Sequence, residues 1–471
     1  MRPFPPRPGP GPVPRRDGIF VKVLLSAFQC CPGRGSEPGI GWHWATALTE
    51  IGHDVTVLTA SAFREPILGV NPQGIDFRFI DFPRSPLHRL SSRAEVYDVY
   101  LRWQAAALKH VQASGQQYDV AHHVVYGGLH LGSMLWKLPV PLVYGPIGGG
   151  QTAPANYWRY FGADWPAETV RTALTGPLLK LNRCRQTIRN AAVTLVCNSE
   201  TEVASRRLGA RDVRFMLPDG LPDDGLARAR RQPAGIPTVF WVGRLLARKA
   251  PVLAVEAFAE LRRTMPARMI IAGDGPMRAQ VHATVDRLGL TQDVEILGGV
   301  PLDDVMRLYD SASVFLFTSL RESFGTPFLE ALGRGLPTVA LSLSGIADAD
   351  VGPAALKIEL TPRPRDLPGQ IAAALRTVLR DKKWELRSEA AVRWAADWTW
   401  PIKAASATKI YQEIAQLQSL MRGSSPCSPG YGVSGLPRCL PVSPSSDPRT
   451  PRFRHRSQPG GSAKRFSYHG H

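Results

Sequence analysis

Two glutamates, Glu322 and Glu330, lie eight positions apart in the segment Arg-Glu-Ser-Phe-Gly-Thr-Pro-Phe-Leu-Glu, residues 321–330. Thr326 followed by Pro327 is typical of a helix start, so we expect Thr326 to cap a helix whose first turn holds Pro327. The free N–H groups of a helix N-terminus bind phosphate. Glu322 would lie in the loop before the helix, and Glu330 about one turn inside it. A carboxylate on each side of a phosphate site suits a nucleotide sugar, with sugar hydroxyls on one flank and ribose hydroxyls on the other. The alternative is a capped helix with two exposed acids.

A basic loop offers cations for such a phosphate group. Residues 242–250 read Val-Gly-Arg-Leu-Leu-Ala-Arg-Lys-Ala and follow an expected strand. Breaking a sugar–diphosphate bond leaves a dianionic leaving group, which Arg244 and Lys249 can neutralise without a metal ion. Arg248 is an extra cation that a looser alignment would bring into this pair. The alternative is a solvated basic loop.

Glycine-rich turns follow several expected strands, where a backbone without Cβ atoms can approach a ligand closely. In the first half of the chain these glycines are Gly35, Gly39 and Gly41, and then Gly148, Gly149 and Gly150; in the second half they are Gly243, Gly273 and Gly275. The first two groups can approach donor phosphate or acceptor across a cleft. A merely flexible loop is the alternative for each group.

Two histidines, His122 and His123, end an expected strand, and either one can face a substrate or be structural. The segment Asp348-Ala349-Asp350 fits a bare Asp-x-Asp metal pattern, but we expect a loop or helix cap there. No other His, Asp or Glu cluster has metal-ligand spacing.

Taken in order along the chain, these motifs resemble those of retaining GT-B glycosyltransferases of family 4 (glycosyl transferases group 1), bacterial type. The resemblance covers about residues 19–420. It implies that Glu322 contacts the donor sugar, that Glu330 contacts the ribose, and that Arg244 and Lys249 hold the diphosphate. Backbone at Phe324, Gly325, Thr326, Gly243, Gly273 and Gly275 would complete the donor site, and either His122 or His123 would face the donor sugar. The usual His-x-His spacing is absent here.

Alternating apolar runs and helical patterns predict an α/β protein with two Rossmann-like, doubly wound domains facing a central cleft. Strands are expected at 20–28, 54–58, 75–80, 118–125, 140–144 and 193–197, then at 238–242, 268–272, 294–297, 314–317 and 338–341. Helices are expected at 40–51, 87–111, 170–190, 252–263, 277–288 and 327–334, and over about 367–420. The expected divisions are a disordered basic tail at 1–18, an acceptor domain at 19–216, a linker at 217–236, a nucleotide-sugar domain at 237–400, a helix at 401–422 that crosses back to the first domain, and a disordered basic tail at 423–471.

Composition limits the remaining options. The 471 residues carry a net charge of +18, and residues 1–19 and 421–471 are rich in Pro, Gly, Ser and Arg. No apolar signal segment or membrane-spanning run is apparent, and the six cysteines match no zinc site, so we expect a cytoplasmic protein. The aromatic segment 157–161 and the basic segment 174–189 fit either contact with an anionic membrane or lipid-linked acceptor, or an ordinary packed surface.

The sequence therefore predicts a metal-independent, hexosyltransferase-type enzyme without a cofactor, whose partners are a nucleotide-sugar donor and a glycan or lipid-linked acceptor. The expected setting is synthesis of bacterial cell-surface polysaccharide or glycolipid, in the cytoplasm or on the inner face of the membrane. Nucleic acid is not expected as a partner. The alternatives are a sugar-nucleotide epimerase or phosphorylase of the same fold, and a non-catalytic protein that binds membrane or nucleic acid.

Overall fold

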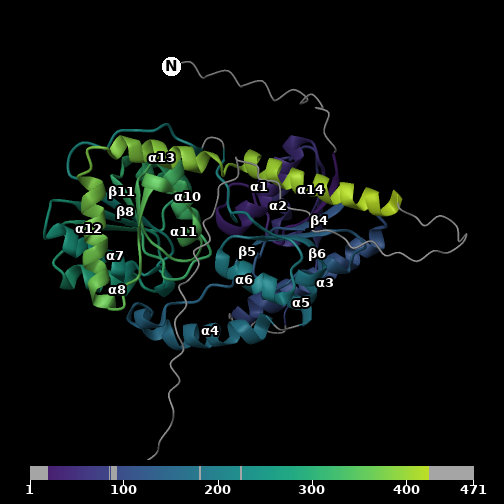
Figure 1. Ribbon diagram of the computed structural model, residues 1–471, viewed down its shortest axis with the longest axis horizontal. Coiled ribbons are helices and arrows are strands. Elements are labelled where there is room, and N and C mark those ends of the chain that lie inside the picture. Colours follow the sequence, from purple (N-terminus) through teal and green to yellow (C-terminus); the bar gives the residue numbers. More distant parts are fainter. Residues whose placement is uncertain (1–19, 84, 86–92, 180–181, 223–224, 424–471) are drawn as a thin grey trace, which may run out of the picture.

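The computed structural model describes residues 20–83, 85, 93–179, 182–222 and 225–423, which form two α/β units side by side (Figure 1). The tails expected at 1–18 and after 423 lie outside the described residues. Each unit has one parallel sheet, which confirms the predicted α/β class with two doubly wound units.

The first sheet has seven strands in the order β3-β2-β1-β4-β5-β6-β7. Its strands are β1 Lys22–Ser26, β2 Asp54–Ala60, β3 Ile75–Ile80, β4 Val120–His123, β5 Leu142–Ile147, β6 Ala191–Val196 and β7 Val213–Phe215. The helices of this unit are α1 Ser36–Ile51, α2 Arg64–Gly69, α3 Arg93–Ser114, α4 Trp165–Leu179, α5 Asn182–Asn190 and α6 Ser199–Leu208.

The second sheet has six strands in the order β10-β9-β8-β11-β12-β13. Its strands are β8 Thr238–Val242, β9 Arg268–Ala272, β10 Val294–Gly298, β11 Val314–Phe317, β12 Thr338–Leu341 and β13 Ala355–Ile358. The helices are α7 Pro251–Arg262, α8 Arg278–Arg287, α9 Leu302–Ser311, α10 Thr326–Gly333, α11 Ser344–Asp348, α12 Leu367–Leu379, α13 Trp384–Ala396 and α14 Trp400–Gly423.

Several elements differ from the sequence expectation. The helix expected at 170–190 is two helices, α4 and α5, and Pro177 lies inside α4. The first part of the helix expected at 87–111 lies outside the described residues, and α3 begins at Arg93. The short strands β7 and β13 and the helices α2, α6, α9 and α11 were not expected.

The strands are apolar on both sides because helices cover both faces of each sheet. In β1, Val23 and Leu25 pack with α1 and α14, whereas Leu24 packs in a second cluster with α3. This alternation follows the two-residue repeat of a strand.

The last helix, α14, belongs to the second unit in sequence but packs on the first unit in space (Figure 1). An apolar stripe on α14 joins the core built by α1, β1 and β2; its residues are Trp400, Ala404, Ala407, Ile410, Tyr411 and Ile414. Ile410 and Tyr411 are adjacent, and the other steps are three or four residues, so all six lie on one helical face. In addition, His53 Nε2 lies 2.8 Å from Thr408 Oγ1.

A second connection is a segment of the first unit that packs on the second unit. The aromatic segment 157–161 leaves the first unit, and Tyr157, Tyr160 and Phe161 pack in the core of the second. The Tyr157 hydroxyl donates to the Thr361 carbonyl and accepts the Thr361 N–H, each at 3.0 Å. Helix α4 follows, and its Glu168 pairs with Arg321 at 2.8 Å. This segment is therefore largely engaged in packing between the two units.

Candidate active site

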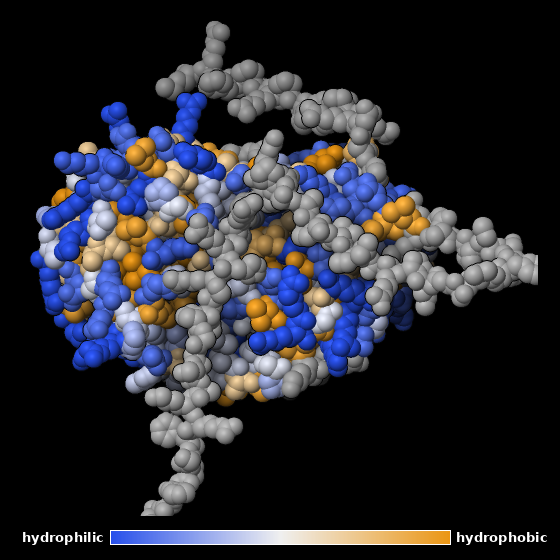
Figure 2. All heavy atoms as spheres, viewed as in Figure 1, coloured by the Kyte–Doolittle hydropathy of each residue, from blue (hydrophilic) through white to orange (hydrophobic). Residues whose placement is uncertain are grey.

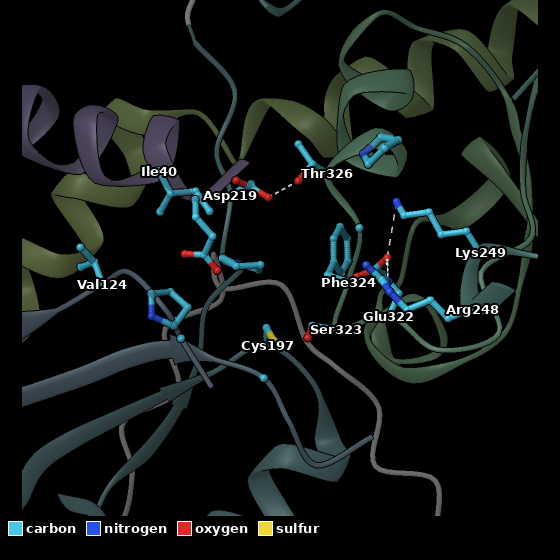
Figure 3. Close-up of a pocket in the computed structure, with 17 residues that line it drawn as sticks. Ile40, Val124, Cys197, Asp219, Arg248, Lys249, Glu322, Ser323, Phe324 and Thr326 are labelled. Carbon is cyan, nitrogen blue, oxygen red and sulfur yellow. Dashed lines mark hydrogen bonds and ion pairs between the residues drawn. The ribbon is translucent and has the colours of Figure 1, made fainter. Parts of the chain in front are cut away.

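A cavity of about 230 Å³ lies between the two units, at the carboxyl ends of their strands (Figure 3). In each sheet the strand order reverses at one point, between β1 and β4 and between β8 and β11. Ligands of doubly wound sheets bind outside the strands at such a reversal. The cavity is lined by residues that follow β1, β4, β5 and β6 in the first unit and β8 and β11 in the second.

Glu322 lies in the cavity wall with two cations of the basic loop (Figure 3). Its Oε2 atom accepts a hydrogen bond from Arg248 Nη1 at 2.7 Å and lies 3.6 Å from Lys249 Nζ. Burial raises the pKa of Glu322, but Arg248 and Lys249 outweigh burial and hold its pKa below the usual value. Glu322 is therefore ionised at neutral pH, and the cations around it can meet further negative charge.

The N-terminus of α10 forms the adjacent wall, where Phe324, Gly325 and Thr326 line the cavity. The cap residue is Gly325, which corrects the expectation that Thr326 caps this helix. Gly325 has φ 105°, and a Cβ atom there would lie 2.5 Å from the Phe317 ring, so only glycine fits. The Thr326 hydroxyl instead donates to the carboxylate of Asp219 (Figure 3). Within the described part of the chain, the N–H groups of these three residues have no protein acceptor.

Glu330 lies one turn further along α10, outside the residues that line the cavity. Its Oε2 atom accepts a hydrogen bond from Tyr309 Oη at 3.0 Å. Burial raises the pKa of Glu330 to about 7, and Asp219 adds to the rise. A carboxyl group with this pKa can exchange hydrogen bonds with a hydroxyl pair such as that of ribose.

The structure brings Arg248 and Lys249 to Glu322, whereas Arg244 is exposed and does not line the cavity. The assignment of Arg244 to the diphosphate stays a prediction. The nearby glycines hold the basic loop against its neighbour: a Cβ atom on Gly273 would lie 2.1 Å from the Gly243 carbonyl oxygen, and one on Gly275 would lie 2.6 Å from that of Leu245.

Of the glycines that the sequence singled out in the first unit, Gly148 lines the cavity. A Cβ atom on Gly148 would lie 2.2 Å from Ser323 Oγ, so the missing side chain lets the two units meet there. Gly35 caps α1, while Gly39 and Gly41 lie in its first turns, close to the carbonyl oxygens of Arg34 and Gln29. Gly149 and Gly150 pack against Leu129 and Glu200. Except for Gly148, these glycines shape the walls rather than line them.

Neither His122 nor His123 lines the cavity, and both are fully buried. His122 Nε2 donates to the Gly145 carbonyl at 2.8 Å, so its Nδ1 accepts from Tyr411 Oη at 2.6 Å. His123 Nε2 lies 2.9 Å from Tyr100 Oη. Burial lowers the pKa of His122 to about 4 and that of His123 to about 3, so both are neutral in the core. The structure thus gives His122 a packing contact with the crossing helix instead of a place in the cavity.

Two carboxylates in the cavity wall were missed from the sequence. Glu37 is in the first turn of α1, and its Oε2 atom accepts the Tyr126 N–H at 2.9 Å. Burial raises the pKa of Glu37 to about 7. Asp219 lies in the expected linker. The position of Glu37 inside a glycine-rich turn was the available signal, but only the fold places Glu37 and Asp219 beside the α10 loop.

The described residues contain no group of three or more His, Cys, Asp or Glu side chains that could hold a metal ion. Asp348, in the Asp-x-Asp segment, accepts the Ser199 N–H at 2.7 Å at the start of α6. No helix within the described ranges is long and apolar enough to cross a membrane. On the face in Figure 2, hydrophobic residues appear as patches among hydrophilic ones.

Comparison with known proteins agrees with this geometry. Residues 227–391 match the family model for glycosyl transferases group 1. The chain is 28% identical over 351 residues to the 2-deoxystreptamine glucosyltransferase of Streptomyces kanamyceticus. This alignment covers 71% of this chain and 86% of that relative.

Solved structures share the fold over most of this chain. The sucrose-phosphate synthase of Thermosynechococcus elongatus has a TM-score of 0.58 at 16% identity, covering 86% of this chain and 100% of the other. The Anabaena protein HepE, solved in complex with UDP-glucose, has a TM-score of 0.53 at 18% identity, covering 85% of this chain and 100% of the other. The fold is therefore GT-B, and the family-model match supports a glycosyltransferase.

Proposed function

We propose that this protein is a retaining glycosyltransferase that moves a hexosyl group from a nucleoside-diphosphate sugar to a hydroxyl acceptor without a metal ion. One observation carries the proposal: the cavity between the units joins an ionised glutamate, two cations and the N-terminus of a helix in one wall. This combination suits a sugar linked to a diphosphate, because the cations and N–H groups offset the charge of the leaving group.

The proposed roles follow from position. Glu322 orients the donor sugar, and Arg248 and Lys249, which hold it, stabilise the departing diphosphate together with the N–H groups of residues 324–326. Glu330 binds the ribose hydroxyls. The acceptor hydroxyl attacks the anomeric carbon on the face that the diphosphate leaves, and its proton passes to a phosphate oxygen. This route requires no enzymic nucleophile.

The donor and the biological setting are parts of the proposal. HepE was solved with UDP-glucose, which makes UDP-sugars the first donors to test. The relative from Streptomyces kanamyceticus is named as a 2-deoxystreptamine glucosyltransferase. Synthesis of cell-surface polysaccharide or glycolipid, with the enzyme at the inner face of the membrane, rests on the family resemblance alone.

The experiment is a thermal-shift panel of UDP-, GDP- and ADP-sugars in the presence of EDTA. A ligand at a hundred times its dissociation constant adds roughly 2.7 kcal/mol of stability. We expect a shift with sugars of one base, unaffected by EDTA and absent in Glu330→Ala. No shift with any sugar nucleotide would count against the donor site and in favour of a non-catalytic binding protein.

Product analysis distinguishes a transferase from an epimerase or a phosphorylase of the same fold. A transferase needs an acceptor for fast turnover, whereas an epimerase converts the donor alone and a phosphorylase requires inorganic phosphate. Rapid formation of a new sugar nucleotide without acceptor would therefore replace the transferase proposal with an epimerase.

A further inference from the structure

The cavity has two walls of opposite electrostatic character. The wall from the second unit carries Arg248, Lys249 and the N-terminus of α10. The facing wall is built by the first unit and the linker; its residues are Glu37, Ile40, Val124, Gly127, Pro146, Gly148, Cys197, Pro218 and Asp219. Its ionisable side chains are two carboxyls and one thiol, and among the described residues it contains no Lys, Arg or His.

Glu37 has one oxygen available on this wall. Its Oε2 atom accepts the Tyr126 N–H at 2.9 Å, which fixes the orientation of the carboxyl group. No described residue donates to the other oxygen, Oε1. Because Glu37 lines the cavity, Oε1 can accept a hydrogen bond from a ligand hydroxyl.

The nearest buried cation does not neutralise this wall for a ligand. Lys403 of α14 is 2% exposed, and its Nζ atom donates to the backbone carbonyls of Leu217 and Asp219. The same ammonium group lies over the rings of Trp44 and Trp400, at 5.2 and 4.7 Å from their centroids. Its contacts hold the linker to the crossing helix, and no described cation pairs with Glu37.

A phosphate or carboxylate on a ligand would lose its water beside Glu37 and Asp219 and meet no Lys, Arg or His side chain among the described residues that line this wall. Desolvation opposes such binding, and like-charge repulsion adds to it as Glu37 and Asp219, whose pKa values burial raises, become ionised. Hydroxyl and ammonium groups donate hydrogen bonds to carboxyl groups and carry no such penalty.

We propose that the acceptor presents to this wall a hydroxyl-bearing unit without negative charge, and that Glu37 is the carboxyl group that orients its attacking hydroxyl. This inference rests on the proposed function and names the acceptor class of the same site. An acceptor phosphorylated near the reacting hydroxyl is excluded, whereas a neutral or amine-bearing polyol is accepted.

The test compares matched acceptors in the presence of the nucleotide sugar that gives the thermal shift. The probes are myo-inositol against myo-inositol 1-phosphate, and glucose and glucosamine against glucose 6-phosphate. The readout is nucleoside diphosphate release above the acceptor-free rate. We expect the unphosphorylated compounds to give at least tenfold higher kcat/KM.

A variant tests the residue itself. Glu37→Gln should raise the acceptor KM at least tenfold and leave the thermal shift with donor unchanged. Glu65→Gln is the matched control, since Glu65 is exposed on α2 of the same unit and lies outside the cavity. It should behave as the wild type in both measurements.

Equal or better use of the phosphorylated compounds would overturn the inference, and so would an unchanged acceptor KM in Glu37→Gln. If Glu37→Gln does not fold, the wild type's relative use of phosphorylated and unphosphorylated acceptors still tests the inference. A wild type without any donor shift would instead contradict the proposed donor site, so the two failures are distinguishable.

Discussion

Glu322 and Arg248 form an ion pair of 2.7 Å across two loops that are 74 residues apart in sequence. The pair forms where two strands, β8 and β11, end beside each other in the sheet. Lys249 Nζ lies 3.6 Å from the same carboxylate oxygen. One carboxylate therefore orients two cations toward the cavity, and the three side chains act as a unit.

Glu322→Gln should lower kcat about 10²-fold or more, because an interaction made to the reacting sugar is lost while the fold is kept. The amide has nearly the same shape, but it no longer offsets the charge of Arg248 and Lys249. Nucleoside diphosphate release measures the rate, and thermal unfolding checks the fold. A kcat within threefold of wild type would remove Glu322 from the chemistry.

Lys249→Ala should weaken donor binding by tenfold or more, because the diphosphate loses a charge-assisted hydrogen bond in a desolvated cavity. Titration with the nucleoside diphosphate alone measures this effect. Lys382→Ala removes an exposed lysine outside the cavity and should bind as the wild type does. Equal affinity of Lys249→Ala and Lys382→Ala would show that the loop is only a solvated basic segment.

Glu330→Gln should stabilise the unliganded protein at pH 8 but not at pH 5. The pKa of Glu330 is raised from 4.5 to about 7, so the folded state binds more protons than the unfolded state between these values. The resulting penalty is absent below pH 4.5, grows as the pH rises and is complete above about 7. Thermal unfolding at both pH values measures it, and an equal effect of the substitution at both would contradict the buried carboxyl.

Tyr411→Phe should reduce the free energy of unfolding by about 1–3 kcal/mol, because His122 Nδ1 would remain buried without its hydrogen-bond donor. Urea unfolding measures this loss. Tyr97→Phe is the control, since Tyr97 is 42% exposed on α3. An unchanged stability of Tyr411→Phe would show that the contact between β4 and α14 contributes little.

Much of the framework was predictable because buried parallel strands have continuous apolar sequences. The expected ranges 75–80, 238–242, 268–272, 314–317 and 338–341 match β3, β8, β9, β11 and β12. The edge strands β7 and β13 were not predicted because each is short and only partly buried, so its apolar pattern is weak. Residues 302–311 mix charged and apolar side chains, and the helical repeat that buries Val305 and Tyr309 was not recognised.

The candidate site was predictable only where local sequence determines it. The loop before α10 and the cations after β8 carry distinctive residue types, and the structure brings Glu322, Arg248 and Lys249 together. The Thr326 hydroxyl donates to Asp219 of the linker because this partly buried carboxylate lies within its reach. The burial of His122 and the position of Glu37 depend on packing between segments that are distant in sequence, which no local pattern encodes.

The crossing helix α14 has a consequence for the order in which this chain folds during synthesis. The first sheet begins at residue 22, but its core is closed by side chains between residues 400 and 414. Domains at the N-terminus of a nascent chain usually fold first. Here the first unit cannot complete its core until nearly the whole second unit has left the ribosome, so a chain that stops before residue 400 would expose the apolar face of α1.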